Sequence, residues 1–173
     1  GGTLFNLTKN YKTVYLVEGA SSVFTLHKYG INNSVAMLGK IFTQQMYGVL
    51  IKNGVNRAIF VFDGDDQGLL GLQDALTLTQ DKSDIKILVK VLPPNRDPDD
   101  IVKEFGVDFF KNIPEVSNYR YQLIRLKNST EETGYDILKK SVFDIIISCK
   151  DSIIQDKMIK MFIEEMNISK TSL

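Results

Sequence analysis

The sequence predicts an α/β fold, a parallel sheet of about four strands flanked by helices and followed by a small helical subdomain. Short β-branched and aromatic runs alternate with helical patterns over residues 13–92. The run from Arg57 to Phe62 is almost continuously apolar, which is typical of a parallel strand covered on both faces. From Pro114 onward the apolar residues recur at helical spacing. We therefore expect two domains, residues 1–113 and residues 114–173.

The elements of the first domain follow one another in a regular order. We expect a strand over 13–17, a helix over 21–29, a strand over 33–37, a helix over 43–53, a strand over 57–62, a helix over 67–78 and a strand over 86–92. Gly30 and Gly54 are placed to end the first two helices, and Thr43 is a favourable N-cap for the second. This order of strand and helix predicts a doubly wound parallel sheet.

Residues 114–173 are expected to form about three helices and no strand. Their apolar residues recur at intervals that place them on one helix face. The three runs are Tyr119, Leu123, Ile124 and Leu126; Ile137, Leu138, Val142, Ile145 and Ile146; and Ile153, Ile154, Met158, Phe162 and Ile163. We expect a loop from Asn128 to Thr133. The pattern by itself indicates a packing module, because apolar periodicity says little about function.

The composition excludes several classes of protein. The 173 residues carry 21 basic and 21 acidic side chains, so overall charge does not attract nucleic acid. A single cysteine, Cys149, excludes an internal disulfide and indicates a reducing compartment. We find no secretory leader and no apolar run of about eighteen residues, and therefore expect a cytoplasmic protein without a membrane span.

Carboxylates follow three of the expected strands. Glu18 comes after the first strand, Asp63 and Asp65 after the third, and Asp97 and Asp99 after the fourth. Because parallel strands end at the same edge of a sheet, we expect all five side chains to converge there. The like charges of such a cluster repel one another and destabilise the fold unless cations neutralise them. Oxygen ligands without a nearby thiolate or histidine suit Mg²⁺ or Mn²⁺. The sequence thus predicts a metal-binding site whose substrate is a phosphate ester.

Two simpler interpretations of the Asp63 segment are weaker. Asp63-Gly64 is a common hairpin turn, but residues 69–76 have helical spacing instead of the alternation of a returning strand. The spacing of an EF-hand calcium loop is also present, at Asp63, Asp65, Gln67, Gly68 and Asp74. That loop requires a helix before it and a glutamate at its last position, whereas this chain has a strand and an aspartate there.

Taken together, the motifs resemble the Toprim superfamily, and most closely the catalytic core of DnaG-type primases. The residues that carry the resemblance are Val17-Glu18-Gly19, Tyr29-Gly30-Ile31, Val35-Ala36-Met37-Leu38-Gly39, Phe62-Asp63-Gly64-Asp65, Gly68 and Arg96-Asp97-Pro98-Asp99. The similarity spans about residues 13 to 106, and in such primases a helical subdomain follows, as residues 114–167 would here. The resemblance implies a Toprim-like α/β fold.

The resemblance also implies a function, namely metal-dependent nucleotidyl transfer from ribonucleoside triphosphates to make RNA primers on single-stranded DNA. Glu18, Asp63 and Asp65 would be catalytic and hold one Mg²⁺ or Mn²⁺ ion, and Asp97 and Asp99 would hold a second. Nucleotide phosphates would contact Lys40, Lys90 and Arg96. The expected partners are the template, the ribonucleotides and a replicative helicase, in the cytoplasm of a bacterium or of a phage-infected cell.

Two positions depart from the superfamily pattern. Ser22 stands where a further acid is usual, and Lys40 replaces a small hydroxyl residue. No zinc-binding module or basic subdomain accompanies the motifs, so we expect either a fragment or a reduced relative. Two alternatives stay open, a Toprim-type nuclease that uses the same acids to cleave a phosphodiester, and a noncatalytic module that docks a replication subunit.

Overall fold

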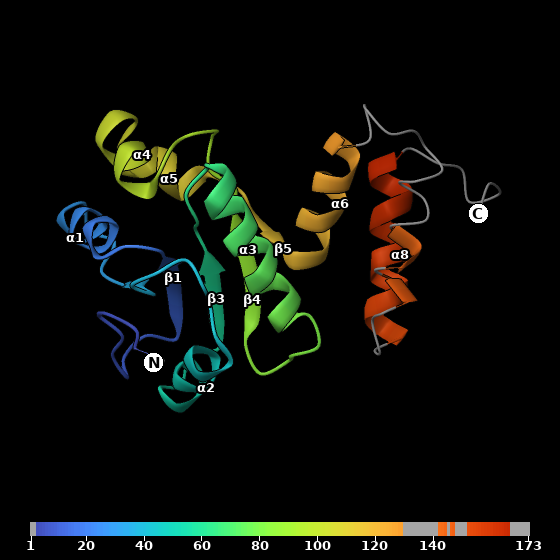
Figure 1. The fold of residues 1–173 in the computed structure, drawn as a ribbon, viewed down its shortest axis with the longest axis horizontal. Helices are drawn as coiled ribbons and strands as arrows, with labels where there is room; N and C mark the ends of the chain where they lie inside the picture. The colour runs from blue at the N-terminus through green and yellow to red at the C-terminus, as the bar shows by residue number, and fades with distance from the viewer. Residues whose placement is uncertain (1–2, 130–141, 145, 148–151, 167–173) are drawn as a thin grey trace. The chain divides into compact units, whose positions relative to one another are not determined.

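Five strands form one sheet in the computed structural model of the chain, which describes residues 3–129, 142–144, 146–147 and 152–166. The strands are β1 (Thr13–Val17), β2 (Ser34–Ala36), β3 (Arg57–Phe60), β4 (Lys86–Lys90) and β5 (Glu115–Ser117), in the spatial order β2-β1-β3-β4-β5. Figure 1 labels four of them, β1, β3, β4 and β5, in this order. β1 pairs in parallel with β2 and β3, and β3 pairs in parallel with β4. The predicted α/β fold with a parallel sheet is confirmed.

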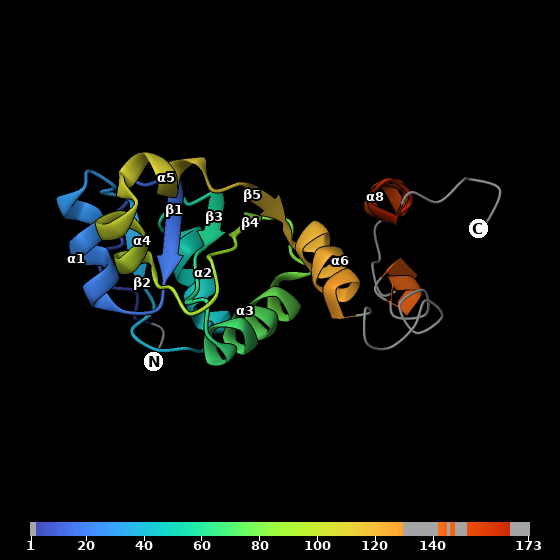
Figure 2. The same ribbon diagram turned by 90° about the horizontal axis from the view of Figure 1, so that it is seen from above.

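Helices cover both faces of this sheet, as Figure 2 shows. They are α1 (Ala20–Lys28), α2 (Gln44–Lys52), α3 (Asp66–Thr79), α4 (Pro98–Glu104) and α5 (Gly106–Asn112). α1, α4 and α5 lie on one face, and α2 and α3 lie on the other. Thr43 caps α2 as predicted, because its side chain accepts a hydrogen bond from the N–H of Met46.

The core alternates along each strand between the two faces. Ile59 packs in a cluster with Val17 and with side chains of α1, α4 and α5, among them Phe110. The next residue, Phe60, points to the opposite face, where its ring meets Phe42 edge to face at 5.1 Å between centroids. This alternation explains why β3 is apolar on both sides, since neither face is exposed to water.

The sheet differs from the sequence prediction at the ends of β3 and β4 and in having β5. β3 ends at Phe60 and β4 at Lys90, two residues earlier than expected, so the last residues of each run belong to the loops. β5 was not predicted, and the expectation of no strand after residue 113 is wrong. The segment Glu115–Ser117 is too short to show strand periodicity, and it is held at the sheet edge by long-range ion pairs from Glu115 to Arg57 and Lys90.

By its internal contacts the chain divides into residues 1–116 and residues 117–173. In the second unit α6 (Asn118–Ser129) and α8 (Ser152–Met166) pack against each other. α6 includes Asn128 and Ser129, where a loop was expected. The rest of that predicted loop lies outside the described residues, as do Ile137, Leu138 and Ile145 of the second predicted helical run. Among the residues that the structure describes, none of the helices is long and apolar enough to cross a membrane.

Candidate functional site

The loops after β1, β3 and β4 meet at the carboxyl edge of the sheet. Their strands are neighbours and parallel, so the residues that follow them emerge on the same side. The loops after β3 and β4 are joined by two backbone hydrogen bonds, from Gly64 N–H to the Arg96 carbonyl (2.8 Å) and from Asn95 N–H to the Gly64 carbonyl (2.9 Å). These bonds hold the segment after Asp63 against the segment before Asp97.

Two glycines allow this close approach. A Cβ atom on Gly64 would overlap the carbonyl of Pro93, and one on Gly68 would overlap the carbonyl of Asp63 and come within 2.9 Å of the Glu18 carboxylate. The first turn of α3 therefore rests directly on the residues that follow β1 and β3. Any larger side chain at these positions would separate the loops.

Glu18 is tied to the neighbouring loop by its side chain. Its Oε1 accepts a hydrogen bond of 3.1 Å from the backbone N–H of Asp63, and the residue is buried. Burial raises the pKa of Glu18, while the hydrogen bond from Asp63 and the nearby Lys40 ammonium oppose that rise. The carboxylate thus has a structural bond in addition to its predicted role.

Asp63 lies at the centre of a group of acids. Burial, and then the charges of Glu18, Asp97 and Asp65, raise the pKa of Asp63 to about 6, with Lys40 acting in the opposite direction. We call Asp63 and the three acids whose charges act on it the acidic cluster. Its members are Glu18, Asp63, Asp65 and Asp97. A raised pKa of this origin indicates negative charge that nearby protein cations do not fully compensate.

Asp65 and Asp97 have a second role as helix caps. Asp65 is the N-cap of α3 and accepts a hydrogen bond of 2.6 Å from the N–H of Gly68. Asp97 is the N-cap of α4 and accepts a bond of 2.7 Å from the N–H of Asp100, whose own side chain completes a capping box. One carboxylate oxygen of each is therefore engaged with the backbone.

Asp99 does not join the acidic cluster, contrary to the sequence prediction. It pairs with Lys103 one turn further along α4 and lies near Thr25 of α1. Burial opposes its ionisation, but hydrogen bonds from Lys103 and Thr25 outweigh burial and hold the pKa of Asp99 below its ordinary value. Since Asp97 caps the helix, Asp99 falls inside its first turn and faces a different neighbour, which the sequence spacing did not reveal.

The three predicted nucleotide ligands occupy different environments. Lys40 is exposed and donates a hydrogen bond to Gln67 Oε1, next to the acidic cluster. Arg96 contributes its carbonyl to the loop contact with Gly64, while its guanidinium pairs with Glu104 at 2.7 Å. Lys40 and the backbone of Arg96 are thus at the predicted edge.

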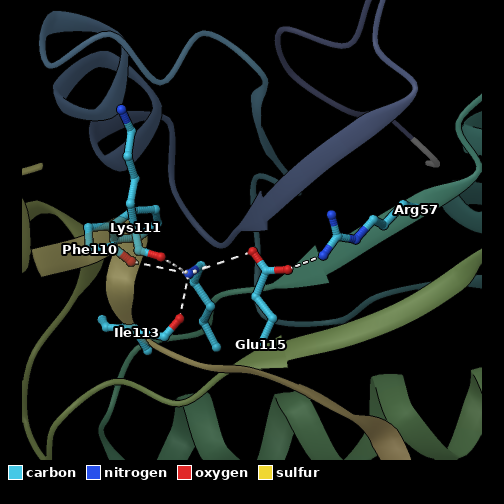
Figure 3. Close-up of polar contacts among 6 residues, drawn as sticks. Arg57, Phe110, Lys111, Ile113 and Glu115 are labelled. Atoms are coloured by element: carbon cyan, nitrogen blue, oxygen red, sulfur yellow. Dashed lines mark hydrogen bonds and ion pairs between the residues drawn. The ribbon is translucent and has the colours of Figure 1, made fainter. Parts of the chain in front are cut away.

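Lys90 does not lie at the edge of the sheet where a nucleotide was expected to bind, contrary to the sequence prediction. Its side chain is buried in the interior of the domain. Its ammonium donates to the carbonyls of Phe110 (3.2 Å), Lys111 (3.1 Å) and Ile113 (2.6 Å) and lies 3.6 Å from Glu115 (Figure 3). These carbonyls end α5, where a cation suits both the unpaired acceptors and the helix dipole. Burial lowers the pKa of Lys90, and Glu115 opposes that change. Side chains alternate along a strand, and this one points to the α5 face.

The carboxylate oxygens of the acidic cluster are the kind of ligand that a hard divalent cation prefers. All are carboxylates, and Asp63 is a half-buried acid whose pKa is raised by burial and then by the charges of Glu18, Asp97 and Asp65. Within the described ranges, however, no three acidic, histidine or cysteine side chains are already arranged to hold an ion. Asp65 and Asp97 each use one carboxylate oxygen in a helix cap, which leaves the second oxygen of each available to a cation.

Two residues at this edge were not among the predicted site residues. Gln67 accepts a hydrogen bond from the Lys40 ammonium. Gly71 lets the backbone of Lys40 approach α3, since a Cβ atom on Gly71 would lie 2.7 Å from the Lys40 carbonyl. Nothing in the sequence pairs Lys40 with residues so far along the chain. The only available signal was the position of Gln67 between Asp65 and Gly68.

The fold and this cluster define an open parallel α/β domain with an acidic site at the carboxyl edge of its sheet. The chain belongs to the Toprim-like family, which matches residues 15–102. A DNA primase of Listeria innocua is 31% identical over 136 residues, which cover 73% of this chain and 22% of that protein. The chain thus spans less than a quarter of that relative's length.

Solved structures share the fold. The Escherichia coli primase catalytic core superposes with a TM-score of 0.75 at 21% identity, covering 99% of this chain and 59% of that one. A DnaG primase catalytic domain bound to single-stranded DNA gives a TM-score of 0.75 at 22% identity, covering 94% of this chain and 56% of that one. At these identities the likeness concerns the fold alone.

Proposed function

We propose that this chain is the catalytic Toprim part of a DNA primase, which joins ribonucleotides into RNA primers on a single-stranded DNA template. The observation that carries the proposal is the acidic cluster in a Toprim-like domain that is 31% identical to a DNA primase. Nucleotidyl transfer needs metal ions and a positioned hydroxyl and no side-chain nucleophile, which agrees with a site made of carboxylates.

Divalent cations would be held by the acidic cluster. Glu18, Asp63 and Asp65 are the ligands that we assign to a first Mg²⁺ or Mn²⁺ ion, and Asp97 the ligand to a second. Asp99 would take part only if it left Lys103. Bound cations would neutralise triphosphate charge and make the attacking 3′-hydroxyl more acidic.

The residues around the cluster would hold the substrate. Gly64 and Gly68 keep the loops close enough for Asp63 and Asp97 to act on one phosphate chain. Lys40 and Arg96 are the cations that we assign to phosphate oxygens, because both belong to the loops of this edge. In this role the protein would work in the cytoplasm with template, ribonucleotides and a replicative helicase.

The test uses the purified chain, radiolabelled ribonucleotides, single-stranded DNA and Mg²⁺ or Mn²⁺. We expect labelled oligoribonucleotides with the wild type and with the control Asp74→Asn, which changes an exposed acid of α3. We expect none with Asp63→Asn. Cleaved template without new oligomers would replace the proposal by a nuclease. Metal binding with neither product would favour the noncatalytic module.

A further inference from the structure

The loop that carries Lys40 is fixed at two points. The N–H of Gly39 donates to the carbonyl of Glu18 at 3.3 Å, which ties the loop to the end of β1. The carbonyl of Lys40 lies against Gly71 of α3, where there is no room for a side chain. The backbone of Lys40 is therefore held between the two elements that support the acidic cluster.

Gln67 fixes the other end of the same side chain. It lies in the first turn of α3, between the cap Asp65 and Gly68, which rests on Asp63 and Glu18. The Lys40 ammonium donates to Gln67 Oε1 and is thereby kept beside these acids. In agreement, Lys40 opposes the rise in pKa of both Glu18 and Asp63.

Neighbouring cations of this domain have other partners. Lys103 pairs with Asp99, Arg96 pairs with Glu104, and Lys90 is enclosed by carbonyls at the end of α5. Lys40, in contrast, donates to Gln67, which lies in the capped first turn of α3 between Asp65 and Gly68. A positive charge fixed at this place opposes the approach of a second positive charge to the same carboxylates.

We infer that Lys40 is a built-in counter-ion that weakens divalent-cation binding by the acidic cluster, and that Gln67 is the positioning residue that holds it there. The inference rests on the proposed metal site and adds to it a residue pair that sets the affinity. Before a metal binds, the ammonium offsets part of the acidic charge, and a divalent ion must overcome its repulsion.

The test measures Mn²⁺ binding by the electron paramagnetic resonance signal of free Mn²⁺, at fixed pH and low salt. We expect Lys40→Gln to bind Mn²⁺ about tenfold more tightly than the wild type, and Gln67→Ala to bind it about threefold more tightly. The double variant should match Lys40→Gln, since Gln67 acts through Lys40. The gain should shrink at high salt, because Lys40 is exposed.

Lys52→Gln is the matched control, because it removes an equal charge from an exposed position at the far end of α2. Its Mn²⁺ affinity should equal that of the wild type. If the wild type binds Mn²⁺ and Lys40→Gln binds it no more tightly, the inference fails while the proposed metal site stands. If neither protein binds Mn²⁺, both fail. An effect of Gln67→Ala in the Lys40→Gln background would also overturn the assigned role of Gln67.

Discussion

The carboxylate of Glu18 accepts a hydrogen bond of 3.1 Å from the backbone N–H of Asp63. One predicted metal ligand thereby fixes the backbone of another, across two neighbouring parallel strands. The bond needs an oxygen acceptor at position 18 but no charge. Structure and metal binding can therefore be separated at this residue.

Glu18→Gln should keep the fold and weaken metal binding. Its amide oxygen can still accept from Asp63, so we expect the free energy of unfolding in EDTA to stay within about 1 kcal/mol of the wild type. Glu18→Ala leaves the partly buried N–H of Asp63 without an acceptor and should lose about 1–3 kcal/mol. Urea unfolding of both variants measures the difference, and equal losses would show that the hydrogen bond does not anchor the loop.

Asp63→Asn should stabilise the metal-free protein at neutral pH. The pKa of Asp63 rises from 3.8 to about 6 on folding, so the folded state binds more protons between these values, and wild-type stability falls as the pH rises through them. Allowing for solvent screening at a half-buried group, we expect the variant to be roughly 1–2 kcal/mol more stable at pH 7.5. Unfolding in EDTA should show this advantage vanish below about pH 4, whereas a pH-independent difference would contradict its cause.

Metal binding should release protons at mildly acidic pH. With the pKa of Asp63 at about 6, the carboxyl is mostly protonated at pH 5 and must ionise to bind a cation. We expect Mn²⁺ affinity to rise about tenfold from pH 5 to pH 7.5. Titration calorimetry in two buffers of different ionisation enthalpy measures the protons released, and a flat affinity over this range would argue against Asp63 as a ligand.

Gly64→Ala should destabilise the site edge. The added methyl group would overlap the Pro93 carbonyl and force the loops after β3 and β4 apart, at a cost of about 2–3 kcal/mol. Gly48→Ala is the matched control, because Gly48 lies in the exposed part of α2 with open space around it. That change should stabilise the helix by about 0.5–1 kcal/mol. Thermal unfolding of both variants tests the contrast, which equal effects would contradict.

Lys90→Met should cost about 3 kcal/mol of stability. It leaves the carbonyls at the end of α5 without their cation and leaves the partly buried Glu115 with Arg57 alone. Lys86→Met changes an exposed lysine of the same strand and should stay within about 0.5 kcal/mol. Denaturant unfolding compares the two. If Lys90→Met retains stability but loses nucleotide binding, the sequence prediction for Lys90 was correct after all.

Local sequence patterns were sufficient for most of the parallel sheet. The apolar run of β3, the cap at Thr43 and the strand-helix order predicted elements within one or two residues of those observed. They did so because strand and helix periodicity and capping are properties of neighbouring residues. β5 was missed because three residues show no period and because its position depends on ion pairs with distant strands.

The sequence by itself determined that acids follow three parallel strands, and hence that an acidic edge exists. Only the tertiary structure decided which side chains share it. Asp97 acts on Asp63, whereas Asp99 faces α1, Lys90 points into the interior and Lys40 is held by Gln67. The physical reason is that the order of the strands along the chain fixes where a residue emerges, while the direction of its side chain depends on partners far away in the sequence.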